Sequence, residues 1–256
     1  MANMFSLEGK NAIVVGGAGG IGQAIAQGLA QCGANVGIAS RNMANLSKTA
    51  EEIKGKTGKD VKIFQVDSGD EDSVKKLVET VVAEMGTVDI LVNSQGINNK
   101  GFAIEFPMDE WDKVFNLNVK GVMMCCKHFG KIMKEQKNGN IINVSSVRGV
   151  RANAGGNSAY CASKGAVDMI TRTLAAELAP HNIRVNAIGP ALVNTGMIAK
   201  LIKEPGRLEG YVRNIPMGRI GEPEDMAGAA VFLAGPAASF ITGQILYIDG
   251  GLTAIG

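Results

Sequence analysis

The stretch Val14-Val15-Gly16-Gly17-Ala18-Gly19-Gly20-Ile21-Gly22 decides the fold, because it joins a short apolar run to a helical pattern. Residues 11–15 are apolar and β-branched, as in a buried strand, and residues 20–32 have the periodicity of a helix. Glycines at 16, 20 and 22 allow a tight turn, close approach of the backbone to a ligand and close packing of helix on sheet. A helix N-terminus at this place would present N–H donors and its positive dipole end to a pyrophosphate. The stretch therefore predicts a dinucleotide site at Gly16, Gly20, Ile21 and Gly22.

Outward from this stretch, short apolar runs alternate with longer helical patterns. Strands are predicted at 11–15, 35–39, 61–66, 88–92, 140–144, 183–188 and 244–248. The longest predicted helices are at 107–137, as one helix or a pair, and at 158–179. Regular alternation with apolar strands predicts an α/β fold, a parallel sheet with helices on both faces. No boundary interrupts the pattern, so residues 1–256 should form a single domain, with a substrate lid at about 191–220.

Composition argues against several classes of function. A net charge of +2 over 256 residues is too small to indicate binding of nucleic acid or a membrane surface. No apolar run reaches the roughly 20 residues that span a bilayer, and the N-terminus lacks a signal-peptide pattern. The four cysteines include no Cys-x-x-Cys spacing, and the two histidines cannot build a metal cluster. We therefore predict a soluble, cytoplasmic protein with no metal.

The end of the second predicted strand indicates which nucleotide is bound. An acidic residue there would hold the ribose 2′-hydroxyl of NAD, but Ala39-Ser40-Arg41-Asn42 contains none. Ser40 and Arg41 instead offer a hydroxyl and a guanidinium, which suit a 2′-phosphate. The alternative is that Arg41 is a solvated loop charge. We predict a preference for NADP(H) over NAD(H).

Tyr160-Cys161-Ala162-Ser163-Lys164 begins the helix predicted at 158–179. The i,i+4 spacing puts Tyr160 and Lys164 on one helical face. A free Tyr has a pKa of about 10, and a neighbouring ammonium should lower it. Tyr160 can then exchange a proton with an alcohol or carbonyl oxygen. Cys161 points roughly 100° away from Tyr160 and is expected to face the core.

These residues occur in a wider order that resembles the short-chain dehydrogenase/reductase family over essentially the whole chain. The matching positions are Gly16-x-x-x-Gly20-x-Gly22, Asp67, Asn93-Ser94-Gln95-Gly96, Asn118, Ser146, Tyr160, Lys164, Asn186, Pro190, Thr195 and Asp249-Gly250-Gly251. The resemblance implies a seven-stranded, doubly wound Rossmann sheet, an NAD(P)-dependent oxidoreductase activity and a homotetramer. Val15, Ser94, Gln95 and Ala191 depart from the usual pattern around the cofactor, but no proton-transferring group is changed.

The resemblance also implies a role for each matching residue. In the catalytic set, Ser146 polarises the substrate oxygen, Tyr160 is the acid/base, and Lys164 lowers the Tyr pKa and binds the nicotinamide ribose. Asn118 holds a water that relays protons to Lys164. Of the remaining cofactor contacts, Asp67 would meet adenine, Asn93 the adenosine side, and Val193 with Thr195 the carboxamide. Gly96 and Pro190 are also expected to bind the cofactor.

The substrate is less directly indicated. Residues 38–42, 105–110 and 204–219 resemble gluconate 5-dehydrogenase-like members of the family, so we expect a sugar acid or polyol. Arg148 and Arg151 could pair with a substrate carboxylate, or could be solvated or lie at a subunit contact. A 3-oxoacyl-thioester (acyl-carrier-protein) reductase is the alternative. A non-catalytic NADP-binding sensor is disfavoured, because such proteins usually lose Tyr or Lys.

Overall fold

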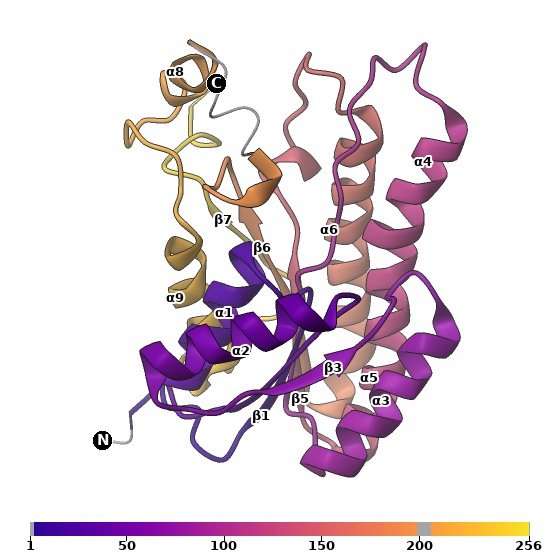
Figure 1. The fold of residues 1–256 in the computed structure, drawn as a ribbon, viewed down its shortest axis with the longest axis vertical. Coiled ribbons are helices and arrows are strands. Elements are labelled where there is room, and N and C mark those ends of the chain that lie inside the picture. The colour runs from indigo at the N-terminus through magenta and orange to yellow at the C-terminus, as the bar shows by residue number, and fades with distance from the viewer. Residues whose placement is uncertain (1–2, 199–205, 256) are drawn as a thin grey trace.

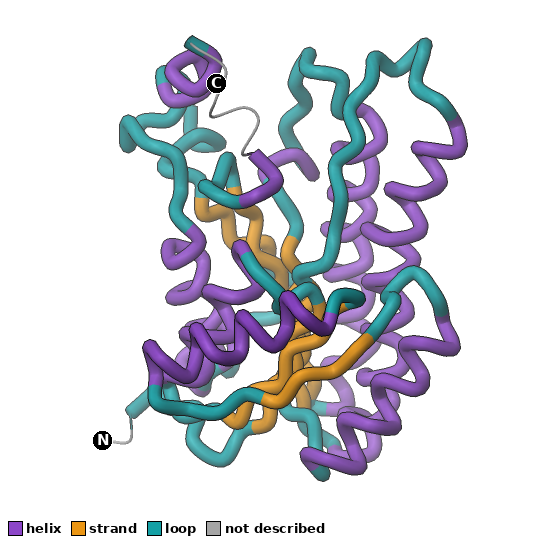
Figure 2. Tube along the Cα trace, viewed as in Figure 1, coloured by secondary structure: helices purple, strands orange, loops and turns teal. Residues whose placement is uncertain are grey.

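The computed structural model describes residues 3–198 and 206–255, whose strands form one central layer between helices (Figure 1, Figure 2). Seven parallel strands lie in the order β3-β2-β1-β4-β5-β6-β7. The strands are β1 (Asn11–Val15), β2 (Asn35–Ser40), β3 (Lys62–Gln65), β4 (Ile90–Asn93), β5 (Gly139–Val144), β6 (Ile183–Pro190) and β7 (Ile245–Ile248). The predicted doubly wound sheet is confirmed, and strand ends differ from the prediction by one or two residues.

Helices cover both faces of the sheet. The α-helices are α1 (Gly20–Gln31), α2 (Met43–Thr57), α3 (Glu71–Met85), α4 (Met108–Phe115), α5 (Gly121–Gln136), α6 (Ser158–Leu178), α8 (Arg207–Val212) and α9 (Pro223–Ala234). The short helices are η1 (Asn116–Lys120), η2 (Val147–Gly149), η3 (Ala179–His181), η4 (Gly196–Ile198) and η5 (Pro236–Ala238). Helices α1, α2 and α9 lie on one face and α3, α5 and α6 on the other (Figure 1). Within the described residues, no helix is both long and apolar enough to cross a membrane.

Alternation along the strands builds a core on each face. In β1, Ala12 and Val14 join the cluster under α1 and α9, while Ile13 and Val15 join the cluster under α3, α5 and α6. Successive strand residues point to opposite faces, so a strand buried on both sides must be apolar throughout. This requirement explains why the strands appear in the sequence as continuous apolar runs.

The order of the strands creates a crevice at their carboxyl ends. From β1 the chain moves outward to β2 and β3, then returns to β4 on the other side of β1. The loops after β1 and β4 therefore diverge, and such a switch point is where ligands bind in open α/β sheets. The two loops start side by side, since Ser94 N donates to Val15 O at 2.8 Å.

The predicted helix at 107–137 is interrupted in the middle. A π-helical turn, η1, separates α4 from α5 and contains Asn118. Single π turns inside α-helices occur frequently at functional sites. The apolar periodicity continues through the turn, so the sequence pattern does not reveal it.

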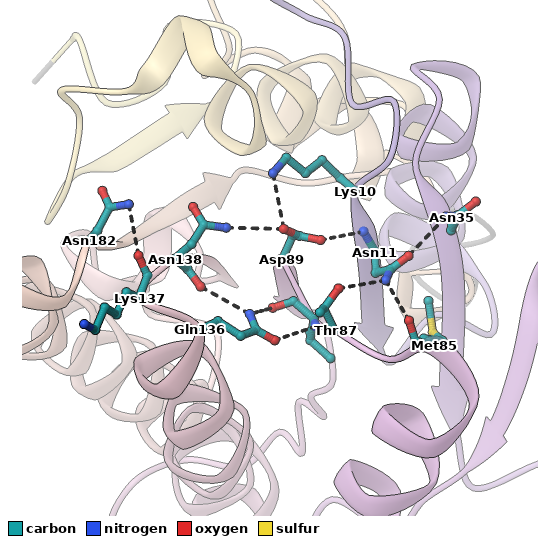
Figure 3. A network of polar contacts seen from close by, with 11 residues as sticks. Lys10, Asn11, Asn35, Met85, Thr87, Asp89, Gln136, Lys137, Asn138 and Asn182 are labelled. Carbon is teal, nitrogen blue, oxygen red and sulfur yellow. Dashed lines mark hydrogen bonds and ion pairs between the residues drawn. The ribbon is translucent and has the colours of Figure 1, made fainter.

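A polar network closes the opposite, amino-terminal edge of the sheet (Figure 3). The Asp89 carboxylate accepts hydrogen bonds from Asn11 N at 2.9 Å and from Lys10 Nζ and Asn138 Nδ2 at 3.2 Å each. Gln136 Nε2 donates to Val88 O at 2.9 Å. These bonds hold the starts of β1, β4 and β5 together at the end of the sheet opposite the crevice.

Candidate active site

A cavity of about 720 Å³ opens at the carboxyl ends of the strands and brings together most of the predicted site residues. Those that line it are Gly20, Ile21, Gly22, Gly96, Ser146, Arg148, Arg151, Tyr160, Lys164, Pro190, Val193 and Thr195. Those outside the lining are Gly16, Ser40, Arg41, Asp67, Asn93 and Asn118. The residues of the second group do not line the cavity. Their hydrogen bonds show which of them support neighbouring loops and which have polar groups free to bind a ligand.

The turn between β1 and α1 has room only for glycine at positions 16 and 22. A Cβ at Gly22 would lie 2.2 Å from Gly16 O, and one at Gly16 would lie 2.6 Å from Gln95 N. Gly16 also has a φ of +82°, where a side chain is strained. Helix α1 has no side-chain cap at its N-terminus. Its first N–H groups therefore face the cavity and can bind a phosphate.

The carboxyl ends of β2 and β3 lie next to this turn. Gly16 N donates to Ala39 O at 2.8 Å, which places Ser40 and Arg41 just beyond the glycines. Ser40 Oγ is buried without a hydrogen-bond partner, and the Arg41 side chain is exposed. Asp67 is also exposed, and its Oδ1 accepts from Gly69 N at 3.0 Å. The cluster contains an orphaned hydroxyl and a guanidinium where a ribose phosphate would lie.

Asn93 differs from its expected role. Its side chain is 1% exposed and points into the sheet, where Nδ2 donates to Asn143 Oδ1 at 2.9 Å. A second contact, at 3.3 Å, joins Nδ2 to Cys126 Sγ. The side chain therefore supports β4 and β5 and does not line the cavity.

Tyr160 and Ser146 meet inside the cavity. A hydrogen bond joins their hydroxyls and lowers the pKa of Tyr160, but burial has a larger effect, and the pKa is raised overall. This direction is opposite to the lowering expected from Lys164. At neutral pH Tyr160 is therefore a phenol that can donate its proton. Ser146 Oγ is held in place by Pro190 O at 3.3 Å and by Arg148 N, which donates to it at 3.1 Å.

Lys164 is buried beneath Tyr160. Its Nζ lies 5.6 Å from the centroid of the Tyr160 ring and donates to Val144 O at 2.7 Å. Burial lowers the pKa of Lys164 to about 8, although the Asp168 carboxylate opposes the shift. The spacing prediction is correct in that both side chains reach one site, but the ammonium points at a strand carbonyl as well as at the ring.

The side chain of Asn118 is fully occupied. Its Oδ1 accepts from Ile97 N at 2.8 Å, and its Nδ2 contacts Ile97 O at 2.9 Å and Ser163 Oγ at 3.1 Å. These bonds fix the loop after β4 against α6. These bonds use both hydrogens of Asn118 Nδ2, so the side chain has no free donor for a water.

Asp168, a buried carboxylate one turn beyond Lys164, was not predicted as part of the site. It is 2% exposed, accepts a hydrogen bond from Ser145 Oγ, and has a second oxygen without a partner. Burial raises its pKa. The i,i+4 spacing from Lys164 was the signal that could have found it.

The two arginines have different surroundings. Arg151 donates to Leu252 O and, at 3.4 Å, to Ile255 O, so it holds the C-terminal segment. Arg148 donates through one nitrogen to Arg151 O and Ala152 O, both at 3.2 Å, and its charge acts on Tyr160. Lys100 adds another cation to the wall, whereas no Asp or Glu occurs among the described lining residues. The cavity is therefore suited to an anion.

Cys161 is half-buried rather than part of the core, so that expectation was wrong. Cys161 is not among the described residues that line the cavity, as expected.

The segment predicted as a lid supplies the wall opposite Tyr160. Its described residues in the lining are Ala191, Leu192, Val193, Thr195, Met197, Ile198, Tyr211, Asn214 and Ile215. Residues 199–205 of that prediction lie outside the described part of the chain.

The known proteins that this chain resembles are oxidoreductases whose names carry different substrates. A family model described as enoyl-(acyl carrier protein) reductase matches residues 16–253. The chain is 42% identical to the 3-oxoacyl-[acyl-carrier-protein] reductase of Thermotoga maritima, covering 96% of this chain and 98% of that one. It is 39% identical to the 2-dehydro-3-deoxy-D-gluconate 5-dehydrogenase of Dickeya dadantii, with 98% of both covered. A gluconate 5-dehydrogenase from Burkholderia cenocepacia, solved with NADP and tartrate, has a TM-score of 0.94 at 31% identity, covering 99% and 98%.

Proposed function

The chain belongs to the short-chain dehydrogenase/reductase family of oxidoreductases, and we propose that it moves a hydride between NADP(H) and an alcohol or ketone carbon of a sugar acid or polyol. The observation that carries this proposal is the cavity wall, where Tyr160, Ser146 and Lys164 lie together with Lys100 and Arg148 and without a described carboxylate. An electropositive wall favours an anionic substrate.

The protein groups fit a dinucleotide phosphate. The cradle at Gly16 and Gly22 leaves room for no Cβ, and the uncapped start of α1 adjoins it. Ser40 Oγ lacks a partner, and Arg41 beside it is exposed. We propose that Ser40 and Arg41 hold the 2′-phosphate, Asp67 the adenine, and Pro190, Val193 and Thr195 the carboxamide.

The mechanism assigns one task to each protein group. When bound, the cofactor accepts or supplies the hydride. Tyr160 exchanges a proton with the substrate oxygen, and its raised pKa keeps the phenol protonated at neutral pH, the form that reduction requires. Ser146 orients the same oxygen by a hydrogen bond. Lys164 supplies the buried positive charge that favours the phenolate in oxidation, and the carbonyl of Asn118 holds the relay water.

The alternative is reduction of a 3-oxoacyl thioester, the activity named for the Thermotoga maritima relative. That reading requires a long apolar channel for the acyl chain. The described wall has apolar side chains, such as Leu192, Met197 and Ile198, that suit an acyl chain, and its cations suit an acidic carrier protein as well as a sugar acid. The amides of Asn98, Asn153 and Asn157 favour a small hydrophilic acid. The presence of both Tyr160 and Lys164 argues against a non-catalytic sensor.

A substrate panel tests the proposal directly. Purified enzyme is assayed at the nicotinamide absorbance band with D-gluconate and related sugar acids in oxidation, and with acetoacetyl-CoA in reduction. We expect kcat/KM with NADP(H) to be highest for a sugar acid. A clear preference for acetoacetyl-CoA would replace the proposed substrate by the acyl thioester.

Replacing Arg41 by Ala should weaken selection of NADP(H). The 2′-phosphate would lose a charge-assisted hydrogen bond worth about 1.5–3 kcal/mol, or roughly 10- to 150-fold in kcat/KM. Activity with NAD(H) should change little. The ratio of kcat/KM for the two cofactors is the measurement. Wild-type preference for NAD(H), or a ratio unaffected by Arg41→Ala, would contradict the assignment.

We also propose a homotetramer. An apolar groove runs along η1, α5 and α6, lined in part by Phe115, Val119, Met123 and Ile170. A second copy of the chain could cover it. Light scattering should give about four times the chain mass of 26.7 kDa, and Met123→Glu should reduce it. A monomer mass at micromolar concentration would reject the proposal.

A further inference from the structure

Three asparagine side chains lie in series in the cavity wall. Asn98 follows β4, whereas Asn153 and Asn157 lie between η2 and α6, and all three line the cavity with Ser146 and Tyr160. Asn98 Nδ2 donates to Asn157 Oδ1 at 3.1 Å, and Asn157 Nδ2 donates to Asn153 Oδ1 at 2.8 Å. The amides therefore form one directed chain across two loops.

Local structure alone would orient Asn157 differently. It is the residue before α6, where Asn side chains usually accept from the first N–H groups of the helix. Here its side chain makes no capping hydrogen bond and is 6% exposed. A backbone bond from Gly101 N to Gly156 O at 2.9 Å holds the two loops together, so the amide chain is part of a built wall.

One end of the amide chain is unsatisfied. Asn98 Oδ1 is buried and has no hydrogen-bond partner. Because Nδ2 is committed to Asn157, Oδ1 presents an acceptor that only a donor can satisfy. The neighbouring Asn99 is different, since its Nδ2 donates to Glu110 Oε2 at 2.6 Å and it is not among the described lining residues.

We propose that Asn98 Oδ1 accepts a hydrogen bond from a non-reacting hydroxyl of the substrate, and that Asn157 and Asn153 are positioning residues for Asn98. This inference rests on the proposed function and narrows its substrate to a polyhydroxylated acid, with the hydroxyl at Asn98 and the carboxylate near Arg148. An acyl chain would leave the buried acceptor unpaired. Sites built to bind a hydroxyl reject analogues that lack it.

The test compares D-gluconate with its monodeoxy analogues, with NADP⁺ as oxidant. In the wild type, the analogue that lacks the hydroxyl bound by Asn98 should have a kcat/KM about 10- to 100-fold below that of gluconate. Asn98→Leu keeps the branched shape of the side chain and removes the acceptor. It should reduce kcat/KM for gluconate to the value for that analogue, so that the preference disappears. Asn99→Leu is the matched control and should retain the wild-type preference.

NADPH binding, followed by fluorescence, establishes that each variant is folded, and Asn98→Ala serves if Asn98→Leu is not. Asn157→Ala should lose part of the preference for the hydroxyl without weakening NADPH binding, an effect that a merely structural role would not produce. If wild type and Asn98 variants discriminate equally among the analogues, this inference is overturned although the proposed function stands. If wild type oxidises no sugar acid, the proposed function fails, and the inference fails with it.

Discussion

Replacing Tyr160 by Phe should lower kcat by about 10²- to 10⁴-fold, the usual contribution of a positioned acid/base. The substitution keeps the ring that packs over Lys164 and removes only the hydroxyl that meets Ser146. Binding of NADPH should therefore survive. The measurement is kcat with the substrate identified by the panel, together with a fluorescence titration of NADPH.

Tyr247→Phe is the matched control, because Tyr247 packs beside Gly189 and is not among the described residues lining the cavity. It should leave kcat within about threefold of wild type. Ser146→Ala should lower kcat, because the substrate oxygen loses a group that orients it. Combining Ser146→Ala with Tyr160→Phe should lower kcat by less than the product of the two single decreases, because the two groups act as a unit. Activity of Tyr160→Phe within about threefold of wild type would mean that Tyr160 is not the acid/base.

Replacing Lys164 by Met should abolish most activity and yet stabilise the folded chain. The substitution removes the charge proposed to support the phenolate and, with it, the contact with the nicotinamide ribose that the family resemblance implies. We therefore expect kcat/KM to fall by at least about 10²-fold and NADPH to bind more weakly. The buried ammonium has a pKa lowered from 10.5 to about 8, which corresponds to a cost of about 3 kcal/mol at neutral pH. Since the bond to Val144 is also lost, we expect a gain of about 1–3 kcal/mol in the free energy of unfolding.

The gain in stability from Lys164→Met should be larger at neutral pH than at alkaline pH. Below about pH 8, Lys164 is protonated in both folded and unfolded chains, and the full cost of burial applies. Between about 8 and 10.5 the folded chain loses the proton first, so the wild type becomes more stable as pH rises. Urea unfolding should show that the free energy of unfolding of Lys164→Met exceeds that of the wild type by more at pH 7 than at pH 9.5. Lys131→Met, which removes an exposed lysine from α5, should show no such dependence.

Much of the fold could be predicted from the sequence, because the relevant constraints are local. Strands buried on both faces require apolar runs, and those runs located all seven strands. The turn at Gly16 and Gly22 tolerates no Cβ, so its glycines are visible as a pattern. The four-residue spacing of Tyr160 and Lys164 likewise placed both side chains in one site before their surroundings were known.

The sequence by itself thus determined the sheet, the glycine turn after β1 and the presence of Tyr160 and Lys164 in one cavity. Only the tertiary structure decided the direction of the Tyr160 pKa, the use of Asn118 as a brace for Ile97, and the role of Arg151 at the C-terminal segment. It also joined Asn98 to Asn157 across 59 residues of sequence. Propensity and periodicity act between residues a few positions apart, whereas burial and hydrogen-bond partners depend on which distant segments the folded chain brings into contact.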